Sequence, residues 1–303
     1  MKLRNLGEDA YIRRIARSGG SSRGVLRGIG DDAAVIRWTA GKLLLFASDM
    51  LIENIHFTLQ QASPYQVGRK ALAVNISDIA AMGGVPKYAL VSLGIDPERS
   101  TEFIRDLYRG MRSIAKKYHV AIVGGDTSAS KTMIVDVSII GETEKGRYVT
   151  RNGARPGDIV LVSGSLGGPS DKHLTFIPRV SESRWLVENF HITSMMDISD
   201  GLLLDLSRIL SASGVGAKIY ASRIPVSGTS ATFKKAVENG EDFELLFTMR
   251  PKEADQLFKK YPKSPITVPF SIIGEITSRN AGFRMVDPDG KSRKVLPRGY
   301  THF

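Results

Sequence analysis

Apolar residues recur along this chain in two alternating patterns, strand-length runs and helical stripes. In the first half, apolar runs predict strands over residues 33–38, 42–48, 88–95, 120–128 and 132–142. Ser63 followed by Pro64 predicts the start of one helix, and Ser100 predicts the N-cap of a second helix that ends near Tyr118. A short helix over residues 8–17 precedes them. This order of strands and helices is typical of an α/β layered domain.

The second half repeats the alternation. The stretch "EKGRYVTRNGARPGD" gathers Gly, Arg and Pro and indicates a boundary near residue 150. Beyond it we expect strands over 159–164, 194–199, 217–221, 243–249 and 270–277, with helices over 201–213, near Phe233 and over 251–261. We therefore predict two domains, residues 1–148 and 149–303, each long enough to bury its own core.

Composition narrows the class of protein. The 303 residues are 42% hydrophobic, carry a formal net charge of +11 and include no cysteine. The lack of cysteine excludes a disulfide framework, a thiolate metal site and a cysteine nucleophile. No apolar run approaches the ~20 residues of a membrane span, and the first residues lack the apolar core of a secretory signal. We expect a cytoplasmic protein without a membrane partner.

The positive charge does not by itself predict nucleic-acid binding. Basic residues are spread over several predicted helix surfaces, and no helix-turn-helix, zinc-finger or RNA-binding aromatic pattern accompanies them. We therefore expect no nucleic-acid partner. A positive field also attracts small anions such as nucleotides.

Aspartates stand at the ends of several predicted elements, often beside glycine. Each has an ordinary explanation, because Asp126 after two glycines could be a turn residue, and Ser199 or Asp200 could cap the following helix. Short carboxylates among Gly, Ser and Thr are, however, the ligands that Mg²⁺ takes while it shares phosphate oxygens of a substrate. Together they predict a site for several cations that carries a polyphosphate. Its candidates are Asp31, Asp32, Asp49, Asp78, Asp126, Asp197 and Asp200.

Other phosphate-binding motifs are missing from the sequence. It has no Walker A loop, no protein-kinase signature and no dinucleotide-binding G-x-G-x-x-G after a strand. A phosphotransferase built on this chain would therefore hold its nucleotide through metal ions and glycine-rich backbone.

Nine stretches in order give the chain a family resemblance. They are "GIGDDAAVI", "SDMLIENIHF", "KALAVNISDIAAMGG", "IVGGDTS", "TRNGARPGD", "MDISDGLLLDLSRI", "GEDFELLFT", "IGEI" and "GYTHF". With them the chain resembles the thiamine-monophosphate kinase family of the AIR-synthetase-like superfamily from residue 28 to residue 303. The resemblance implies an α/β (α+β layered), two-domain PurM/AIR-synthetase-like fold. In it, the N-terminal domains of a homodimer build a shared β-barrel, and the C-terminal domain is α/β.

The resemblance also implies an activity. The family transfers the γ-phosphoryl group of ATP directly onto thiamine monophosphate, giving thiamine diphosphate, with the help of several Mg²⁺ ions. The nucleophile is a phosphate oxygen that is mostly ionised at neutral pH, so we expect no general base. The chemistry itself would then depend on Asp49, Asp126 and Arg151.

Matched motif by motif, the resemblance implies three groups of site residues. The metal ligands would be Asp32, Ser48, Asp49, Asp78, Asp126, Asp197 and Asp200. The ATP contacts would be Tyr108, Gly125, Asp126, Arg151 and Ser199. The contacts to thiamine monophosphate would be His56, Glu241 and Tyr300.

Simpler explanations and departures from the family pattern accompany these assignments. His56 could be a packing residue, Tyr108 a core residue, and Arg151 the partner of Asp158 on the surface. The sequence departs from the family where Ala47 replaces a usual hydroxyl residue and Asn239 a usual glycine. The segment after Leu166 is short, and we expect it to lack a helix that the family usually carries.

Two alternative functions fit part of the pattern. Another ATP-using enzyme of the superfamily, such as the purine-pathway cyclo-ligase, would share the aspartates. A non-catalytic nucleotide-binding or nucleic-acid-binding protein would share the fold, but such a protein does not need every metal ligand.

Overall fold

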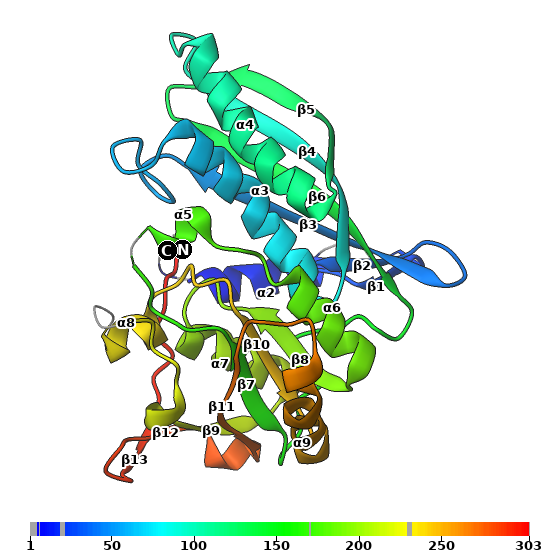
Figure 1. Cartoon of the computed structure of the whole chain (residues 1–303), viewed down its shortest axis with the longest axis vertical. Coiled ribbons are helices and arrows are strands. Elements are labelled where there is room, and N and C mark those ends of the chain that lie inside the picture. Colours follow the sequence, from blue (N-terminus) through cyan, green and yellow to red (C-terminus); the bar gives the residue numbers. More distant parts are fainter. Residues whose placement is uncertain (1–4, 6, 19–21, 170, 229–231, 303) are drawn as a thin grey trace.

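The computed structural model describes residues 5, 7–18, 22–169, 171–228 and 232–302. In it, two sheets with their own helices follow one another along the long axis of the molecule (Figure 1). The first sheet ends with β6 at Glu144 and the second begins with β7 at Ile159. The expected division at residues 148 and 149 falls in the segment between them.

The first sheet has six strands in the order β1-β2-β3-β6-β4-β5, and only β4 and β5 pair in parallel. Helices α3 (Pro64–Ala81) and α4 (Thr101–Tyr118) pack against each other and cover one face of this sheet (Figure 1). In a single chain the sheet stays open and does not close into a barrel. Its strands are β1 (Val25–Arg27), β2 (Ala34–Arg37), β3 (Lys42–Ile52), β4 (Val85–Ile95), β5 (Ala121–Ala129) and β6 (Ile134–Glu144).

Helix α3 is buried on almost all sides and begins where the sequence predicts. The Ser63 side chain accepts a hydrogen bond from the Gln66 amide, and Gln66 bonds back to the Ser63 amide, which completes a capping box before Pro64. The Ser100 side chain caps α4 by accepting a hydrogen bond from the Phe103 amide. Both predicted helix starts are confirmed.

The second sheet lies between helices on both faces. Helices α7 (Leu202–Ser213) and α8 (Phe233–Glu238) cover one face, and α6 (Val180–Asn189) and α9 (Pro251–Lys260) cover the other. The strand order is β13-β12-β9-β11-β7-β10-β8, and only β9 and β12 pair in parallel. Its strands are β7 (Ile159–Ser163), β8 (Ile192–Asp197), β9 (Gly216–Tyr220), β10 (Leu245–Met249), β11 (Phe270–Thr277), β12 (Phe283–Val286) and β13 (Ser292–Lys294). Three short 3₁₀ turns complete the described chain: η1 (Ala221–Arg223), η2 (Tyr261–Lys263) and η3 (Arg279–Ala281).

The segment between β7 and β8 packs against the first half of the chain. Helix α5 (Lys172–Thr175) and α6 both lie against α3. The Arg69 guanidinium donates to the Phe176 carbonyl over 2.6 Å, and the Phe176 ring stacks on that of Phe243 at 4.0 Å. Residues from both halves therefore surround α3.

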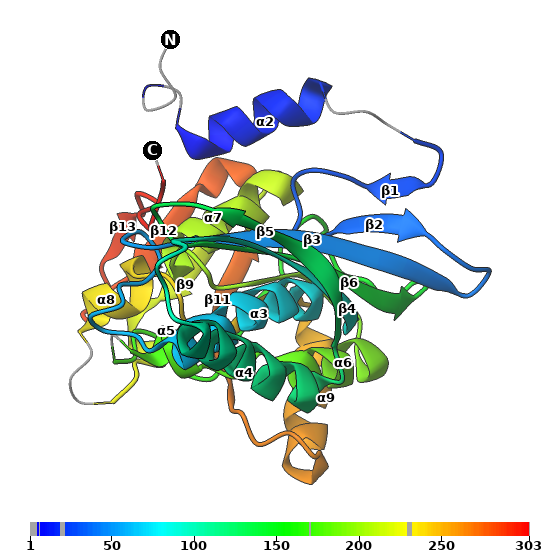
Figure 2. The same cartoon turned by 90° about the horizontal axis from the view of Figure 1, so that it is seen from above.

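Both ends of the described chain lie on the same side of the molecule. Helix α2 (Glu8–Ser18) runs beside the second half, with its first turn near the C-terminal segment (Figures 1 and 2). Glu8 Oε2 accepts a hydrogen bond from the His302 amide, and Asp9 lies 3.5 Å from Arg208 Nε.

The pattern of apolar residues missed some elements. Strand β3 continues to Ile52, although the apolar run stops at Ser48, because Asp49 through Ile52 keep pairing with β6. The short elements β1, α5, β12 and β13 and the helix α6 were not expected. Within the described ranges, no helix is both long and apolar enough to cross a lipid bilayer.

Candidate active site

Three aspartates from three elements meet where the two halves adjoin. Asp32 lies in the turn before β2, Asp78 in the last turn of α3, and Asp197 at the end of β8. One carboxylate oxygen of each lies within 4.8 Å of the other two. We call these three residues the aspartate trio.

Strand pairing explains how residues so far apart in sequence converge. Ala34 of β2 lies opposite Phe46 of antiparallel β3, so the residues before β2 run alongside the end of β3. Ser77, which precedes Asp78 on α3, donates a 2.5 Å hydrogen bond to Asp197 Oδ2. This bond fixes the helix of the first half against a strand of the second.

The trio has the charge and chemistry of a cation site. Burial, and then the neighbouring carboxylates, raise the pKa of Asp78 and of Asp197 well above the usual range. Asp32 Oδ2 is buried and has no hydrogen-bond partner in the described part of the chain. Several converging carboxylates with a free buried oxygen are the hard ligands that Mg²⁺ prefers. The residues present fit a divalent cation.

Asp49 extends this acidic group. Its backbone amide donates to Asn75 Oδ1 of α3 over 3.0 Å, which holds β3 against the helix. The residue keeps part of its surface exposed, but enclosure of the carboxyl group, and then Asp200 and Asp136, raise its pKa to about 6. Asp49 is thus electrostatically coupled to carboxylates of both halves.

Neither Ser199 nor Asp200 caps α7. Gly201 occupies the N-cap, and Asp205 Oδ2 accepts from the Asp200 and Gly201 amides at 3.0 and 3.1 Å. The Asp200 carboxylate is instead held by Arg208 Nη1 at 2.5 Å. The helix-cap explanation of the "DISDG" stretch is wrong, because Gly201 is the N-cap and the Asp205 side chain binds the two amides that precede the helix.

Arg151 faces the trio rather than the surface. Its Nη2 donates to Asp32 Oδ1 over 2.6 Å, and its amide donates to Asp31 Oδ1 over 2.7 Å. Burial alone would lower the pKa of Arg151, but the Asp32 carboxylate outweighs burial and raises it. The surface pairing with Asp158 is wrong, since that carboxylate accepts from Thr193 Oγ1. Among the described residues nothing bonds to the buried Arg151 Nε.

Ser48 and Asp126 lie on the open face of the first sheet. Side chains alternate along β3, so Ser48 and Asp49 point to opposite faces. Ser48 Oγ donates to Asp136 Oδ1 over 3.2 Å. Ser92 of β4 lies opposite both Asp136 and Asp126, so these carboxylates share one level of the sheet. Neither Ser48 nor Asp126 belongs to the trio.

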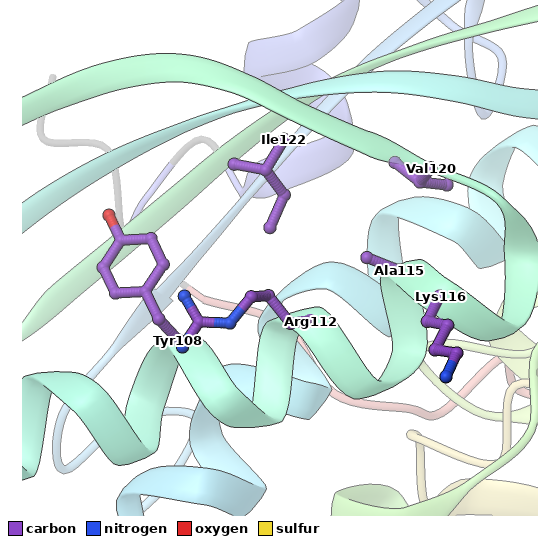
Figure 3. Close-up of a pocket in the computed structure, with 6 residues that line it drawn as sticks. All are labelled: Tyr108, Arg112, Ala115, Lys116, Val120 and Ile122. Atoms are coloured by element: carbon purple, nitrogen blue, oxygen red, sulfur yellow. The ribbon is translucent and has the colours of Figure 1, made fainter.

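Tyr108 and Gly125 lie at the edge of the first sheet. Tyr108 lines a pocket of about 620 Å³ between α4 and β5, with Arg112, Lys116 and Ile122 among its walls (Figure 3). The Tyr108 ring also packs against the first core, so it has the core contacts that its helical spacing indicates. Gly125 has a φ of 152°, and a Cβ there would overlap the backbone of Val91, so only glycine fits.

His56, Glu241 and Tyr300 gather around the first half of α3. The ring of His302 joins His56 to Tyr300, with centroid separations of 5.2 and 5.0 Å. Glu241 Oε1 accepts a 2.5 Å hydrogen bond from Lys70 Nζ of α3, and its amide donates to the Ser199 carbonyl. We call Lys70, together with His56 and Glu241, the lysine cluster. The cluster lies toward the beginning of α3, whereas Asp78 lies at the end of that helix.

Several residues that shape the site were missed. Lys70, Asn75 and Ser77 are polar but fully buried on α3, and Asp205 and Arg208 hold Asp200 from α7. The signal was present in "KALAVNISDIAAMGG", where four polar residues, Lys70, Asn75, Ser77 and Asp78, interrupt an otherwise apolar helix. A buried polar side chain needs a partner, so each of them indicates a contact to another element.

Both halves of the chain are similar to known proteins. Residues 30–143 match the family model described as AIR synthase related protein, N-terminal domain, and residues 177–287 match its C-terminal domain. The chain is 36% identical to thiamine-monophosphate kinase of Bacillus subtilis (strain 168), covering 91% of this chain and 93% of that protein. It is 33% identical to thiamine-monophosphate kinase of Aquifex aeolicus (strain VF5) over the full length of both.

A solved structure shares the whole architecture. It is described as AaThiL complexed with AMPPCP and TMP, and it is 32% identical to this chain with a TM-score of 0.84. The match covers 100% of this chain and 99% of that one. Both sheets and their helices therefore correspond to the two-domain AIR-synthetase-like fold.

Proposed function

The chain belongs to the thiamine-monophosphate kinase family, and from that membership we propose that it transfers the γ-phosphoryl group of ATP in line onto thiamine monophosphate. It is a phosphotransferase whose products are ADP and thiamine diphosphate. The observation that carries the proposal is the aspartate trio, which draws on both halves and fits divalent cations. A protein that only bound a nucleotide would not require three converging carboxylates at that junction.

Magnesium would be held by the carboxylates of both halves. Asp32, Asp78 and Asp197 would supply the trio, Asp49 and Asp200 would extend it, and Ser48 and Asp126 would add ligands on the open face. Mg²⁺ bound there neutralises the phosphate oxygens of the two substrates. Asp136, beside Ser48, would add further negative charge for a cation to offset.

The transfer breaks the bond between the γ-phosphorus and the bridging oxygen and forms one to a phosphate oxygen of thiamine monophosphate. That nucleophile is already mostly ionised at neutral pH, because the second pKa of a phosphomonoester is ~6. No side chain has to remove a proton. Arg151, a cation fixed by Asp31 and Asp32, would orient the nucleotide and oppose the repulsion between the two polyanions.

The remaining ATP contacts would come from the edge of the first sheet and the β8–α7 loop. The pocket beside Tyr108 offers an aromatic ring and the cationic Arg112 and Lys116, which suits a nucleotide. Gly125 lets a ligand approach the backbone closely. Ser199, next to Asp200, would contact the phosphates. His56, Glu241 and Tyr300 would hold thiamine monophosphate.

A homodimer would cover the open face of the first sheet. Phe46, Met50, Tyr88, Leu90 and Val123 are large apolar residues exposed on its strands. Such a row is typical of an interface, and pairing of two open faces would give the shared barrel that the resemblance implies.

We expect Leu90→Asp to convert a dimer to a monomer in light scattering, whereas Phe258→Asp, on the exposed surface of α9, should leave the dimer unchanged. A monomeric unmodified protein would contradict the dimer.

The use of ATP as co-substrate, in a chain without cysteine, supports a cytoplasmic location.

The kinase assay follows thiamine diphosphate by its fluorescence after oxidation. We expect one ADP for each diphosphate formed, and loss of turnover when EDTA removes the cations. Asp49→Asn and Asp126→Asn should lose turnover while circular dichroism shows an intact fold. ATP use that depends on formylglycinamidine ribonucleotide and not on thiamine monophosphate would instead support the cyclo-ligase.

A further inference from the structure

Lys70 is a fully buried lysine whose charge is satisfied by three acceptors. Its Nζ lies 2.8 Å from the His56 carbonyl, 2.7 Å from His173 Nδ1 and 2.5 Å from Glu241 Oε1. An ammonium group has three N–H bonds, so all of its donors are used. Burying a lysine is costly unless it is paired, yet an apolar residue in this helix would remove that cost. The position therefore has a purpose beyond packing.

We propose that Lys70 is a positioning residue for the vitamin part of the substrate, acting through Glu241. This inference rests on the proposed function, in which Glu241 and His56 contact thiamine monophosphate. Lys70 fixes the Glu241 carboxylate and the His56 loop together, from behind the surface that the substrate meets.

The loop that carries Glu241 needs an interaction that holds it in place. Glu241 and Phe243 both have positive φ, at 66° and 52°, which is unusual for residues with a side chain. Only 38% of the Glu241 side chain is exposed, while Lys70 is fully enclosed. The ion pair therefore has a buried end and an accessible end. Because Lys70 holds one oxygen of the Glu241 carboxylate, the accessible part of that carboxylate has a single orientation.

Lys70 also orders two imidazoles. His173 Nδ1 lies 2.7 Å from Lys70 Nζ and 3.0 Å from Glu241 Oε2. Because an ammonium group has no lone pair, this nitrogen accepts from Lys70, and a neutral His173 ring then carries its hydrogen on Nε2. His56 Nδ1 accepts from the Ile52 amide at 2.9 Å, which places the hydrogen of a neutral His56 ring on Nε2 as well. Burial, and for His173 then Lys70, lowers the pKa of both rings, which favours their neutral forms. Thiamine carries a cationic thiazolium ring, and neutral imidazoles beside a carboxylate do not repel it.

Helix α3 connects this cluster to the metal end of the site. Lys70 and Asp78 are eight positions apart on one helix, which corresponds to a rise of about 12 Å. A rigid helix therefore sets the distance between the two ends of the site.

A double-mutant cycle tests the proposal. We expect Lys70→Met to raise the KM for thiamine monophosphate at least tenfold while the KM for ATP changes less than twofold. Glu241→Gln should behave alike, and the double variant should resemble Glu241→Gln to within threefold, because Lys70 acts through that carboxylate. Lys87→Met, which removes a half-exposed lysine of β4, should leave both KM values unchanged.

The outcomes separate this proposal from the proposed function. If the unmodified protein does not phosphorylate thiamine monophosphate, the proposed function fails. If it does, and Lys70→Met either leaves KM unchanged or multiplies the effect of Glu241→Gln, the role of Lys70 is overturned.

A second variant covers the case in which Lys70→Met does not fold. His173→Phe removes, at a partly exposed position, a group that contacts both Lys70 Nζ and Glu241 Oε2. We expect at least a threefold rise in the KM for thiamine monophosphate with no change for ATP. An unchanged KM would count against the lysine cluster.

Discussion

At the scale of single residues, the carboxylate of Asp78 has two opposed effects. It is a ligand that the proposed reaction needs, yet burial and its acidic neighbours raise its pKa, so its charged form is disfavoured in the folded protein alone. Function and stability therefore place contrary demands on the same atoms.

The first prediction concerns Asp78→Asn. We expect the variant to lose turnover by at least ~100-fold, as removal of a metal ligand does. In EDTA its melting temperature should rise by about 2–8 °C, because the substitution removes one of the negative charges that repel one another. Each kcal/mol of unfolding free energy shifts the Tm by about 2–4 °C for a protein of this size. The measurements are the fluorescence assay for thiamine diphosphate and thermal unfolding by circular dichroism. Asp106→Asn on α4 is the control, and an Asp78→Asn variant that melts lower in EDTA would refute the repulsion.

The second prediction concerns Gly125. An alanine there must adopt a φ near 152° and overlaps the Val91 backbone, so we expect Gly125→Ala to lose roughly 1–3 kcal/mol or more of unfolding free energy. Gly124→Ala is a matched control, because its Cβ would meet only the Leu90 side chain, at 3.2 Å. Equal midpoints of urea unfolding for the two variants would contradict the prediction, because they would show that the backbone of β5 shifts to accept the alanine.

At the scale of elements, α3 is the part of the molecule on which the site is built. It carries Lys70, Asn75, Ser77 and Asp78, and each contacts or adjoins a different segment of the chain. The helix is buried on nearly every side, so its polar residues have fixed partners.

The third prediction tests one of these contacts. Ser77→Ala removes the donor to Asp197, and we expect the Mg²⁺ concentration for half-maximal activity to rise about 10–100-fold, the usual effect of losing a partner of a metal ligand. Ser113→Ala is matched, because that serine of α4 bonds to the Gly110 carbonyl of its own helix. A Ser77→Ala enzyme with an unaltered Mg²⁺ requirement would show that Asp197 needs no support.

The sequence predicted elements better than contacts between them. Both capped helices and most strands follow from local signals, since caps and apolar periods are properties of neighbouring residues. Strand β3 was ended too early because the pairing of Asp49 with β6 is not visible locally. The sequence identified the aspartates but not which ones meet. Asp32, Asp78 and Asp197 form the trio, whereas Asp126 lies on the open face. Strand register and the packing of α3 against β8 decide this.

At the scale of the whole molecule, the two halves are held together across an acidic junction. Asp49 and Asp205 have pKa values of about 6 and about 7, above the ordinary value of 3.8. Between about pH 4 and pH 7 the folded protein therefore binds more protons than the unfolded chain does. Without cations, the stability of the folded protein falls as the pH rises through this range. Cations that need ionised ligands should reverse this trend.

The fourth prediction follows from that sign. We expect Mg²⁺ to raise the melting temperature at least twice as much at about pH 7.5 as at about pH 5.5, because the carboxylates bind it only when ionised. Scanning calorimetry in EDTA and in Mg²⁺ checks this, with NaCl of equal ionic strength as the control. A shift independent of pH would mean that Mg²⁺ binds elsewhere.

The contact between Glu8 and the His302 amide bears on how every one of these experiments is prepared. Because the His302 ring contacts both His56 and Tyr300, an affinity tag fused after the last residue would lie near the site proposed for thiamine monophosphate, and a polyhistidine tag would also compete for divalent ions. The exposed hairpin turn at Gly290, between β12 and β13, belongs to the far end of the second sheet. A tag inserted there, or one removed completely by protease, would leave both ends of the chain as the fold requires them.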